Sequence, residues 1–250
     1  LPAVPAERVP EVLAKYEGEI QELKIKVAEK GQSLADDIAR VAAARDALPS
    51  ARLKVDANMG YTLAGALEAL RKLCEYGIIY AEQPVASIED MAALRFAIAK
   101  EGLPARIAAD ESIRKAEDPL KVARANAADL MVIKAAPLGG VRRALALVEQ
   151  AQLPAVVSSA LESSVGIATG ASLAASLPTL RYGCGLGTVS LMAEDVTDEP
   201  LIARDGFMDL RTITPSPQRL ERLATDKQTR QWWVERVTAC YRVLERASGL

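Results

Sequence analysis

The chain has 250 residues, half of them hydrophobic, and a formal net charge of −2, which excludes both a disordered chain and a polycationic nucleic-acid binder. It contains no histidine, which excludes Ser-His and Cys-His nucleophiles, His-ligated zinc and an imidazole base. Proton transfer must therefore use lysine, a carboxylate, tyrosine or cysteine, and any metal must be held mainly by oxygen.

Strand and helix patterns alternate along most of the chain. Strands are expected at 23–27, 52–56, 78–82, 105–110, 129–134, 154–158 and 181–185, with helices at 34–48, 62–76, 87–101, 117–126, 140–151 and 163–176. No dinucleotide-binding fingerprint follows the first strand. The repeat therefore predicts an α/β fold of the TIM-like (β/α)-barrel type, in a modified (β/α)7β form, rather than a doubly wound sheet.

Three regions are expected from these patterns. Residues 1–20 form a Pro-rich connector, and because the chain does not begin with Met we expect it to follow a missing N-terminal portion. Residues 21–190 form the barrel with the active site. Residues 191–250 form a loop and a helix at 235–244, a tail expected to pack on the barrel, with Trp232 and Trp233 as packing residues.

The sequence contains neither a recognisable targeting signal nor a cysteine motif. No apolar run reaches the length of a membrane span, and the start lacks the basic region of a signal peptide. Cys74, Cys184 and Cys240 show no metal-ligand spacing and are typical of free thiols in a reducing compartment. We expect a cytoplasmic protein with a small-molecule substrate and neither a nucleic-acid nor a membrane partner.

A polar residue ends each of the first five expected strands. In chain order these residues are Lys26, Asp56, Glu82, Asp110 and Lys134. Neighbouring members lie about 24 to 30 residues apart, the length of one strand–helix unit, and the carboxyl ends of barrel strands meet at one mouth. The order predicts three carboxylates on adjacent strands, with two lysines on opposite sides of them.

Three carboxylates can hold Mg²⁺, with Mn²⁺ as an alternative, and leave room for a substrate carboxylate. Such an ion stabilises the enediolate formed when a carbon next to a carboxylate loses its proton, while one lysine takes that proton. The site thus predicts carbon-acid chemistry.

Alternation along the first strand places Lys24 on the same face as Lys26 and opposite Leu23, Ile25 and Val27. Lys24 is therefore expected inside the barrel. Asn58 either orders Asp56 or contacts substrate. Ser158 and Ser159 end the sixth strand and either bind a substrate carboxylate or serve the structure. Gln83 is expected to support the neighbouring ligand, and Glu111 to have a structural role.

Five stretches resemble the muconate-lactonizing subgroup of the enolase superfamily. They are Leu23-Lys-Ile-Lys-Val, Val55-Asp-Ala-Asn, Ala81-Glu-Gln-Pro, Ala108-Ala-Asp-Glu-Ser and Ile133-Lys-Ala-Ala-Pro. The resemblance covers nearly the whole chain. Two departures from the family pattern are the N-terminal α+β capping domain, which we expect to be missing, and Met59, which follows the Asp-Ala-Asn stretch.

The resemblance implies a lyase with Lys26 as general base and then acid, Asp56, Glu82 and Asp110 as Mg²⁺ ligands, and Lys134 stabilising the enediolate. The implied reaction is dehydration of 2-succinyl-6-hydroxy-2,4-cyclohexadiene-1-carboxylate to 2-succinylbenzoate in menaquinone synthesis. Two alternatives stay open: N-acylamino acid racemisation or dipeptide epimerisation through the same intermediate, and an inactive barrel scaffold because the cap is missing.

Overall fold

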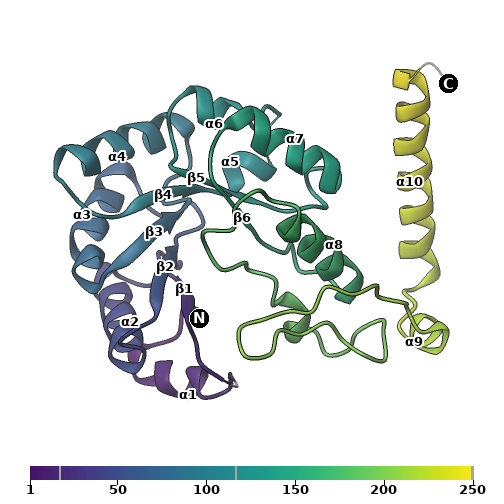
Figure 1. The fold of residues 1–250 in the computed structure, drawn as a ribbon, viewed down its shortest axis with the longest axis horizontal. Helices are drawn as coiled ribbons and strands as arrows, with labels where there is room; N and C mark the ends of the chain where they lie inside the picture. The colour runs from purple at the N-terminus through teal and green to yellow at the C-terminus, as the bar shows by residue number, and fades with distance from the viewer. Residues whose placement is uncertain (17, 116, 249–250) are drawn as a thin grey trace.

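The computed structural model describes residues 1–16, 18–115 and 117–248. Its central element is a parallel sheet of six strands, which neighbour one another in chain order. The strands are β1 (Glu22–Lys26), β2 (Arg52–Asp56), β3 (Ile78–Glu82), β4 (Arg106–Ala109), β5 (Leu130–Ile133) and β6 (Ala155–Val157). The sheet is curled, with helices on its outer side (Figure 1). This is a curled half-barrel of the α/β class.

Helices follow the strands as the alternating pattern predicts. The longer ones on the sheet are α2 (Leu34–Ala47), α3 (Leu63–Leu73), α4 (Ile88–Lys100), α7 (Val141–Ala151) and α8 (Ser164–Ala175). Shorter elements are η1 (Ala6–Arg8), α1 (Val9–Leu13), η2 (Cys74–Tyr76), α5 (Glu111–Arg114), α6 (Lys121–Arg124), η3 (Thr188–Leu191) and α9 (Pro217–Arg222). Ser33 begins α2 with a capping box to Asp36, and the Ser87 hydroxyl caps α4.

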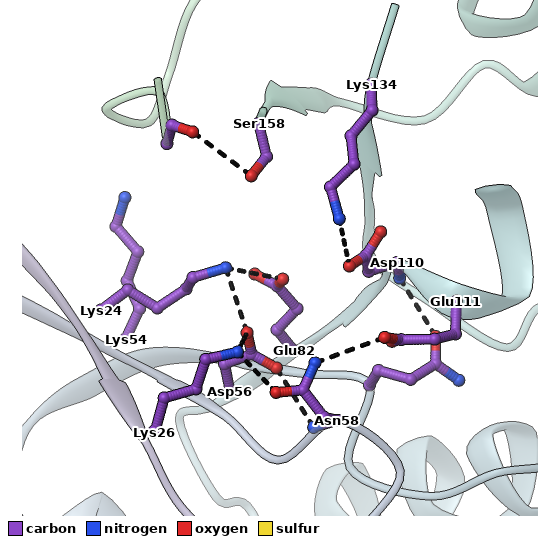
Figure 2. Close-up of polar contacts among 12 residues, drawn as sticks. Lys24, Lys26, Lys54, Asp56, Asn58, Glu82, Asp110, Glu111, Lys134 and Ser158 are labelled. Carbon is purple, nitrogen blue, oxygen red and sulfur yellow. Dashed lines mark hydrogen bonds and ion pairs between the residues drawn. The ribbon is translucent and has the colours of Figure 1, made fainter. Parts of the chain in front are cut away.

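Strand alternation divides the buried residues into two layers. The larger core, between sheet and helices, includes Leu23, Ile25, Val55, Met131 and Ile133. A smaller cluster on the inner face is formed by Tyr80, Ala108, Leu130, Val132, Val156 and Tyr182. The predicted apolar face of the first strand is therefore confirmed, and the polar strand ends lie on the inner side of the sheet (Figure 2).

The seventh strand expected at 181–185 is not formed. The segment makes one isolated parallel bridge, Ser158 to Gly185. The Gly183 N–H instead donates to the Glu22 carboxylate at 2.8 Å, and the Gly183 carbonyl accepts from Lys54 Nζ at 3.0 Å. Because side chains satisfy these backbone groups, the segment follows the sheet edge without a continuous ladder.

The expected helix at 117–126 was also too long. Only α6 is helical there, since Pro119 lacks an N–H and the left-handed Asn126 (φ 52°) ends the turn. The sequence pattern did not predict α5, which begins directly after Asp110.

The tail packs on the barrel only in part. Leu186, Val189 and Leu201 join the main core. The terminal helix α10 (Lys227–Ser248) is far longer than the expected 235–244 and stands apart from the sheet (Figure 1). Trp232 and Trp233 are about half exposed and stack edge-to-face on each other at 4.8 Å between ring centroids, so their expected packing role was wrong. Within the described part of the chain, no helix has the length and apolarity needed to cross a bilayer.

Candidate active site

The predicted polar strand ends come together on the inner face of the sheet (Figure 2). The register of the parallel strands brings three of these residues together, because Lys26 pairs with Asp56 and Asp56 pairs with Glu82 across neighbouring strands. Asp110 follows β4 directly and Lys134 follows β5. The side chains of the three carboxylates are at most 3% exposed. Buried carboxylates require ionic or hydrogen-bonding partners.

Lysines supply those partners from two sides (Figure 2). Lys26 Nζ lies 2.6 Å from Asp56 Oδ2. Lys24 Nζ bridges Glu82 Oε1 at 2.7 Å and Asp56 Oδ2 at 3.1 Å, so its predicted inward direction is confirmed. On the other side, Lys134 Nζ lies 2.6 Å from Asp110 Oδ2. The two predicted catalytic lysines therefore approach the acidic cluster from opposite directions.

These pairings shift the ionisation of the carboxyl groups. Burial opposes ionisation of Asp56, but the ammonium groups of Lys24 and Lys26 outweigh it and lower the pKa of that carboxyl. Burial raises the pKa of Glu82 to about 7, against the attraction of Lys24 and with the help of the Asp56 charge. Burial also disfavours the ammonium of Lys24, yet Glu82 and Asp56 raise its pKa above the ordinary value.

The Glu82 shift predicts a pH-dependent stability in a chelator solution. Folded Glu82 holds its proton to about pH 7, whereas its ordinary pKa is 4.5, so the folded state binds more protons between these values. This contribution to the free energy of unfolding should therefore fall as the pH rises through that window, by on the order of 2 kcal/mol. Urea unfolding at about pH 5 and pH 7.5 should show this fall in the wild type and a smaller one in Glu82→Gln. Equal pH dependence in the two proteins would contradict the assignment.

The carboxylates fit a divalent metal in part. Among residues 1–16, 18–115 and 117–248, the side chains form no ready group of three or more Asp, Glu, Cys or His positioned for a metal ion. The three carboxylates instead lie in ion pairs with lysines. Two observations nevertheless fit a hard cation: the donors are all carboxylate oxygens, and the buried Glu82 Oε2 accepts no hydrogen bond from any described residue.

Asn58 lies between the two halves of the site. Its Oδ1 accepts from Lys26 Nζ at 2.5 Å, its backbone N–H donates to Asp56 Oδ1 at 3.1 Å, and its Nδ2 donates to Glu111 Oε1 at 3.3 Å. Its φ of 43° is left-handed, a conformation that asparagine tolerates. Asn58 thus orders Asp56, one of the two roles that the sequence left open, and it also contacts Lys26.

The two serines at the end of β6 differ in their surroundings. The Ser159 hydroxyl is buried, donates to the Gly185 carbonyl at 2.9 Å and accepts from Thr188 at 2.9 Å. Ser158 is half-buried, and its only contact drawn is a 3.4 Å hydrogen bond to Gly185 (Figure 2). Of the two, Ser158 has the more available hydroxyl.

Supporting residues complete the site. Fully buried Gln83 accepts the Asp110 N–H at 3.0 Å, and thus links the end of β3 to that of β4, as expected. The Arg114 guanidinium contacts both Asp110 (3.1 Å) and Glu111 (2.7 Å), although sequence reasoning passed over it. Its spacing of four residues from Asp110 was the available signal. Glu111 is buried, and its Oε2 accepts no hydrogen bond from a described residue.

A curled parallel sheet that presents carboxylates and lysines at its carboxyl ends is the architecture of an acid/base barrel enzyme. The family described as Enolase C-terminal domain-like matches residues 6–215, and the chain belongs to this family within the enolase superfamily. It is 53% identical to the o-succinylbenzoate synthase of Mycolicibacterium smegmatis over 245 residues, which covers 98% of this chain and 74% of that protein. The o-succinylbenzoate synthase of Mycobacterium leprae is 49% identical over 250 residues, covering all of this chain and 72% of that protein.

Solved structures agree on the fold. The muconate lactonizing enzyme from Pseudomonas putida superposes with a TM-score of 0.76 at 26% identity, over 89% of this chain and 64% of that one. The muconate cycloisomerase from Pseudomonas fluorescens gives 0.73 at 28% identity, over 87% and 61%. The chain thus spans less than two thirds of the length of these two enzymes.

Proposed function

We propose that this chain is an o-succinylbenzoate synthase, a carbon–oxygen lyase that dehydrates 2-succinyl-6-hydroxy-2,4-cyclohexadiene-1-carboxylate to 2-succinylbenzoate in menaquinone biosynthesis. Relatives at about half identity over essentially the whole chain carry that name. The single observation that carries the chemistry is the placement of Lys26 and Lys134 on opposite sides of Asp56, Glu82 and Asp110. We expect this biosynthetic enzyme to work in the cytoplasm.

The proposed reaction needs a base and an acid at neighbouring carbons of the substrate. Neutral Lys26 takes the proton from the carbon that bears the carboxylate. Its ammonium then donates a proton to the hydroxyl group leaving the adjacent carbon, which departs as water. The electron pair from the broken C–H bond forms the last double bond of the aromatic ring. One lysine on one face of the ring serves both transfers.

Lys134 has a different role. Its ammonium lies on the opposite side of the cluster, beside Asp110, and it stabilises the negative charge that builds up on the substrate carboxylate. With a side chain only 10% exposed, Lys134 acts with little competition from water. Ser158, half-buried on the inner face, is the candidate hydroxyl for the succinyl carboxylate.

We propose that Asp56, Glu82 and Asp110 hold Mg²⁺, for which Mn²⁺ could substitute. When bound, this ion would supply a fixed double positive charge that neutralises the developing charge on the substrate carboxylate. The all-oxygen donor set supports this proposal, as does Glu82 Oε2, which accepts no hydrogen bond from a residue that the structure describes. Occupation requires the carboxylates to exchange their lysine partners for the ion, so ion binding and lysine position are coupled.

A racemase or epimerase is the second candidate. Inverting a carbon centre requires a proton donor on the face opposite the base, and Lys134 lies opposite Lys26. The placement of the lysines is therefore compatible with N-acylamino acid racemisation or dipeptide epimerisation as well.

We also propose that segment 181–185 closes the sheet toward a full barrel in place of a seventh strand. Gly185 bridges Ser158 at the end of β6. Gly183 lies against Glu22 of β1 and Lys54 of β2. The segment thus spans the open side between the two edge strands.

Turnover should depend on Mg²⁺. Ultraviolet absorbance can follow conversion of the cyclohexadiene substrate to the aromatic product by this chain, with Mg²⁺ or with a chelator. We expect turnover with Mg²⁺, its loss in chelator, and recovery when Mg²⁺ is restored. An equal rate in chelator would refute the metal proposal, and no turnover under either condition would favour the inactive-scaffold alternative.

A further inference from the structure

A buried ion pair lies directly behind the end of β1. Arg40 and Asp37, one turn apart on α2, are 0% and 1% exposed, and Arg40 Nη1 lies 2.9 Å from Asp37 Oδ1. Neither residue belongs to the acidic cluster or ends a strand. Burying two charges costs several kcal/mol per ion in desolvation, which partners must offset.

Both members of the pair contact the backbone that carries Lys26. Arg40 Nη1 donates to the Lys26 carbonyl at 2.9 Å, and the Ala28 N–H donates to Asp37 Oδ2 at 2.9 Å. Ala28 has a left-handed φ of 59°, which an L-residue adopts only when its surroundings hold it. The pair therefore fixes the strand end on both sides of Val27, and with it the point from which the Lys26 side chain starts.

The same pair connects this strand end to the rest of the site. The Tyr61 hydroxyl, in the loop after β2, donates to Asp37 Oδ2 at 2.6 Å, and the Tyr61 N–H donates to the Pro84 carbonyl after β3 at 3.2 Å. Arg40 also donates to the Val4 carbonyl at 2.6 Å and to Gln32 Oε1. The loops that follow the strands of Lys26, Asp56 and Glu82 thus share one buried anchor.

Arg45 provides an internal comparison. It lies on the same helix and also donates to backbone carbonyls, those of Tyr76 at 3.0 Å, Pro49 at 3.0 Å and Ala51 at 2.8 Å. These carbonyls precede β2 and β3, at the end of the sheet away from the acidic cluster. Arg45 therefore binds backbone carbonyls from the same helix, as Arg40 does, but none of the carbonyls it binds lies at a strand end of the site.

We propose that Arg40 and Asp37 are positioning residues that set the location of the Lys26 amine relative to Asp56 and Asn58. This inference rests on the proposed function only in that Lys26 is its base. Replacement of buried ion pairs is often neutral for stability, so their value can lie in fixing one geometry. Misplacement of a catalytic group by about 1 Å can cost about a hundredfold in rate.

The test compares Arg40→Lys and Tyr61→Phe with the matched control Arg45→Lys. Arg40→Lys should lower kcat about a hundredfold with KM little changed, and Tyr61→Phe, which removes one hydrogen bond to Asp37, should lower it about fivefold. Arg45→Lys should lower the melting temperature and leave kcat unchanged. Side-chain NMR of the Lys26 amine, assigned by its loss in Lys26→Arg, should show a shift in the first two variants only.

A purely structural role predicts a different result. Arg40→Lys and Arg45→Lys would then lose stability to the same extent, keep the wild-type kcat per folded molecule and leave the Lys26 NMR signal unshifted. That result would overturn the inference. If Arg40→Lys does not fold, Tyr61→Phe decides by the same criteria. If the wild type does not dehydrate the diene, the proposed function fails, and the Lys26 signal alone then supports or overturns the positioning role.

Discussion

Lys26→Ala should lower kcat for dehydration by about 10²–10⁴-fold, the usual contribution of a positioned acid/base group. Lys26 is the only proposed acid/base on its face of the substrate, and its amine lies 2.6 Å from Asp56. Loss of the side chain removes both the acceptor of the substrate proton and the donor to the leaving hydroxyl. The measurement is the ultraviolet assay with saturating Mg²⁺.

Lys30→Ala is the matched control for this prediction. Lys30 is an exposed lysine four residues farther along the chain, and its removal changes net charge by the same amount. We expect that variant to keep the wild-type rate. A Lys26→Ala variant that binds Mg²⁺ normally and turns over as fast as Lys30→Ala would remove Lys26 from the mechanism.

Lys134→Met should lower kcat for dehydration by about 10²–10³-fold, because it removes a positive group aimed at developing charge in a buried site. Methionine has a similar length and keeps the packing. Asp110 retains Arg114 as a partner at 3.1 Å, so the loss should not come from unfolding of the strand end. Steady-state kinetics together with thermal unfolding separate the two effects.

Lys134→Arg separates charge from proton transfer. Arginine keeps the charge but does not readily give up a proton. Dehydration should therefore recover in part in this variant. If the chain also racemises N-acylamino acids, both variants should abolish racemisation, because a proton must then arrive from the Lys134 face. Full dehydration activity in Lys134→Met would exclude charge stabilisation by this residue.

Much of the fold could be predicted from the sequence because its signals are local. Alternation of Leu23, Ile25 and Val27 with Lys24 and Lys26 fixes which face of β1 is buried, and the structure places those faces as predicted. The polar residue at the end of each of the first five strands is also a local signal, and these five residues form the polar cluster on the inner face of the sheet. In a parallel barrel, the strand repeat alone carries such residues to one end of the sheet.

The rest depends on contacts between distant parts of the chain. In segment 181–185, the Gly183 backbone forms hydrogen bonds with Glu22 and Lys54, about 130 to 160 residues away. The local strand pattern therefore predicted a seventh strand that does not form. The buried charge of Arg40 could not be expected from a residue type that is mostly exposed. The pairing of Lys24 with Glu82 likewise follows from the curl of the sheet. The apolar residues of α10 led us to expect that this helix packs on the barrel, whereas its residues from Lys227 to Leu244 are exposed.

In the proposed mechanism, one divalent ion is shared by carboxylates from three adjacent strands. The most direct measurement is anomalous diffraction from crystals of this chain soaked with Mn²⁺. We expect one peak per chain, coordinated by oxygens of Asp56, Glu82 and Asp110, with the Lys24 and Lys26 amines moved off Asp56. Carboxylates that stay paired with their lysines at saturating Mn²⁺, with the ion bound elsewhere or absent, would contradict it.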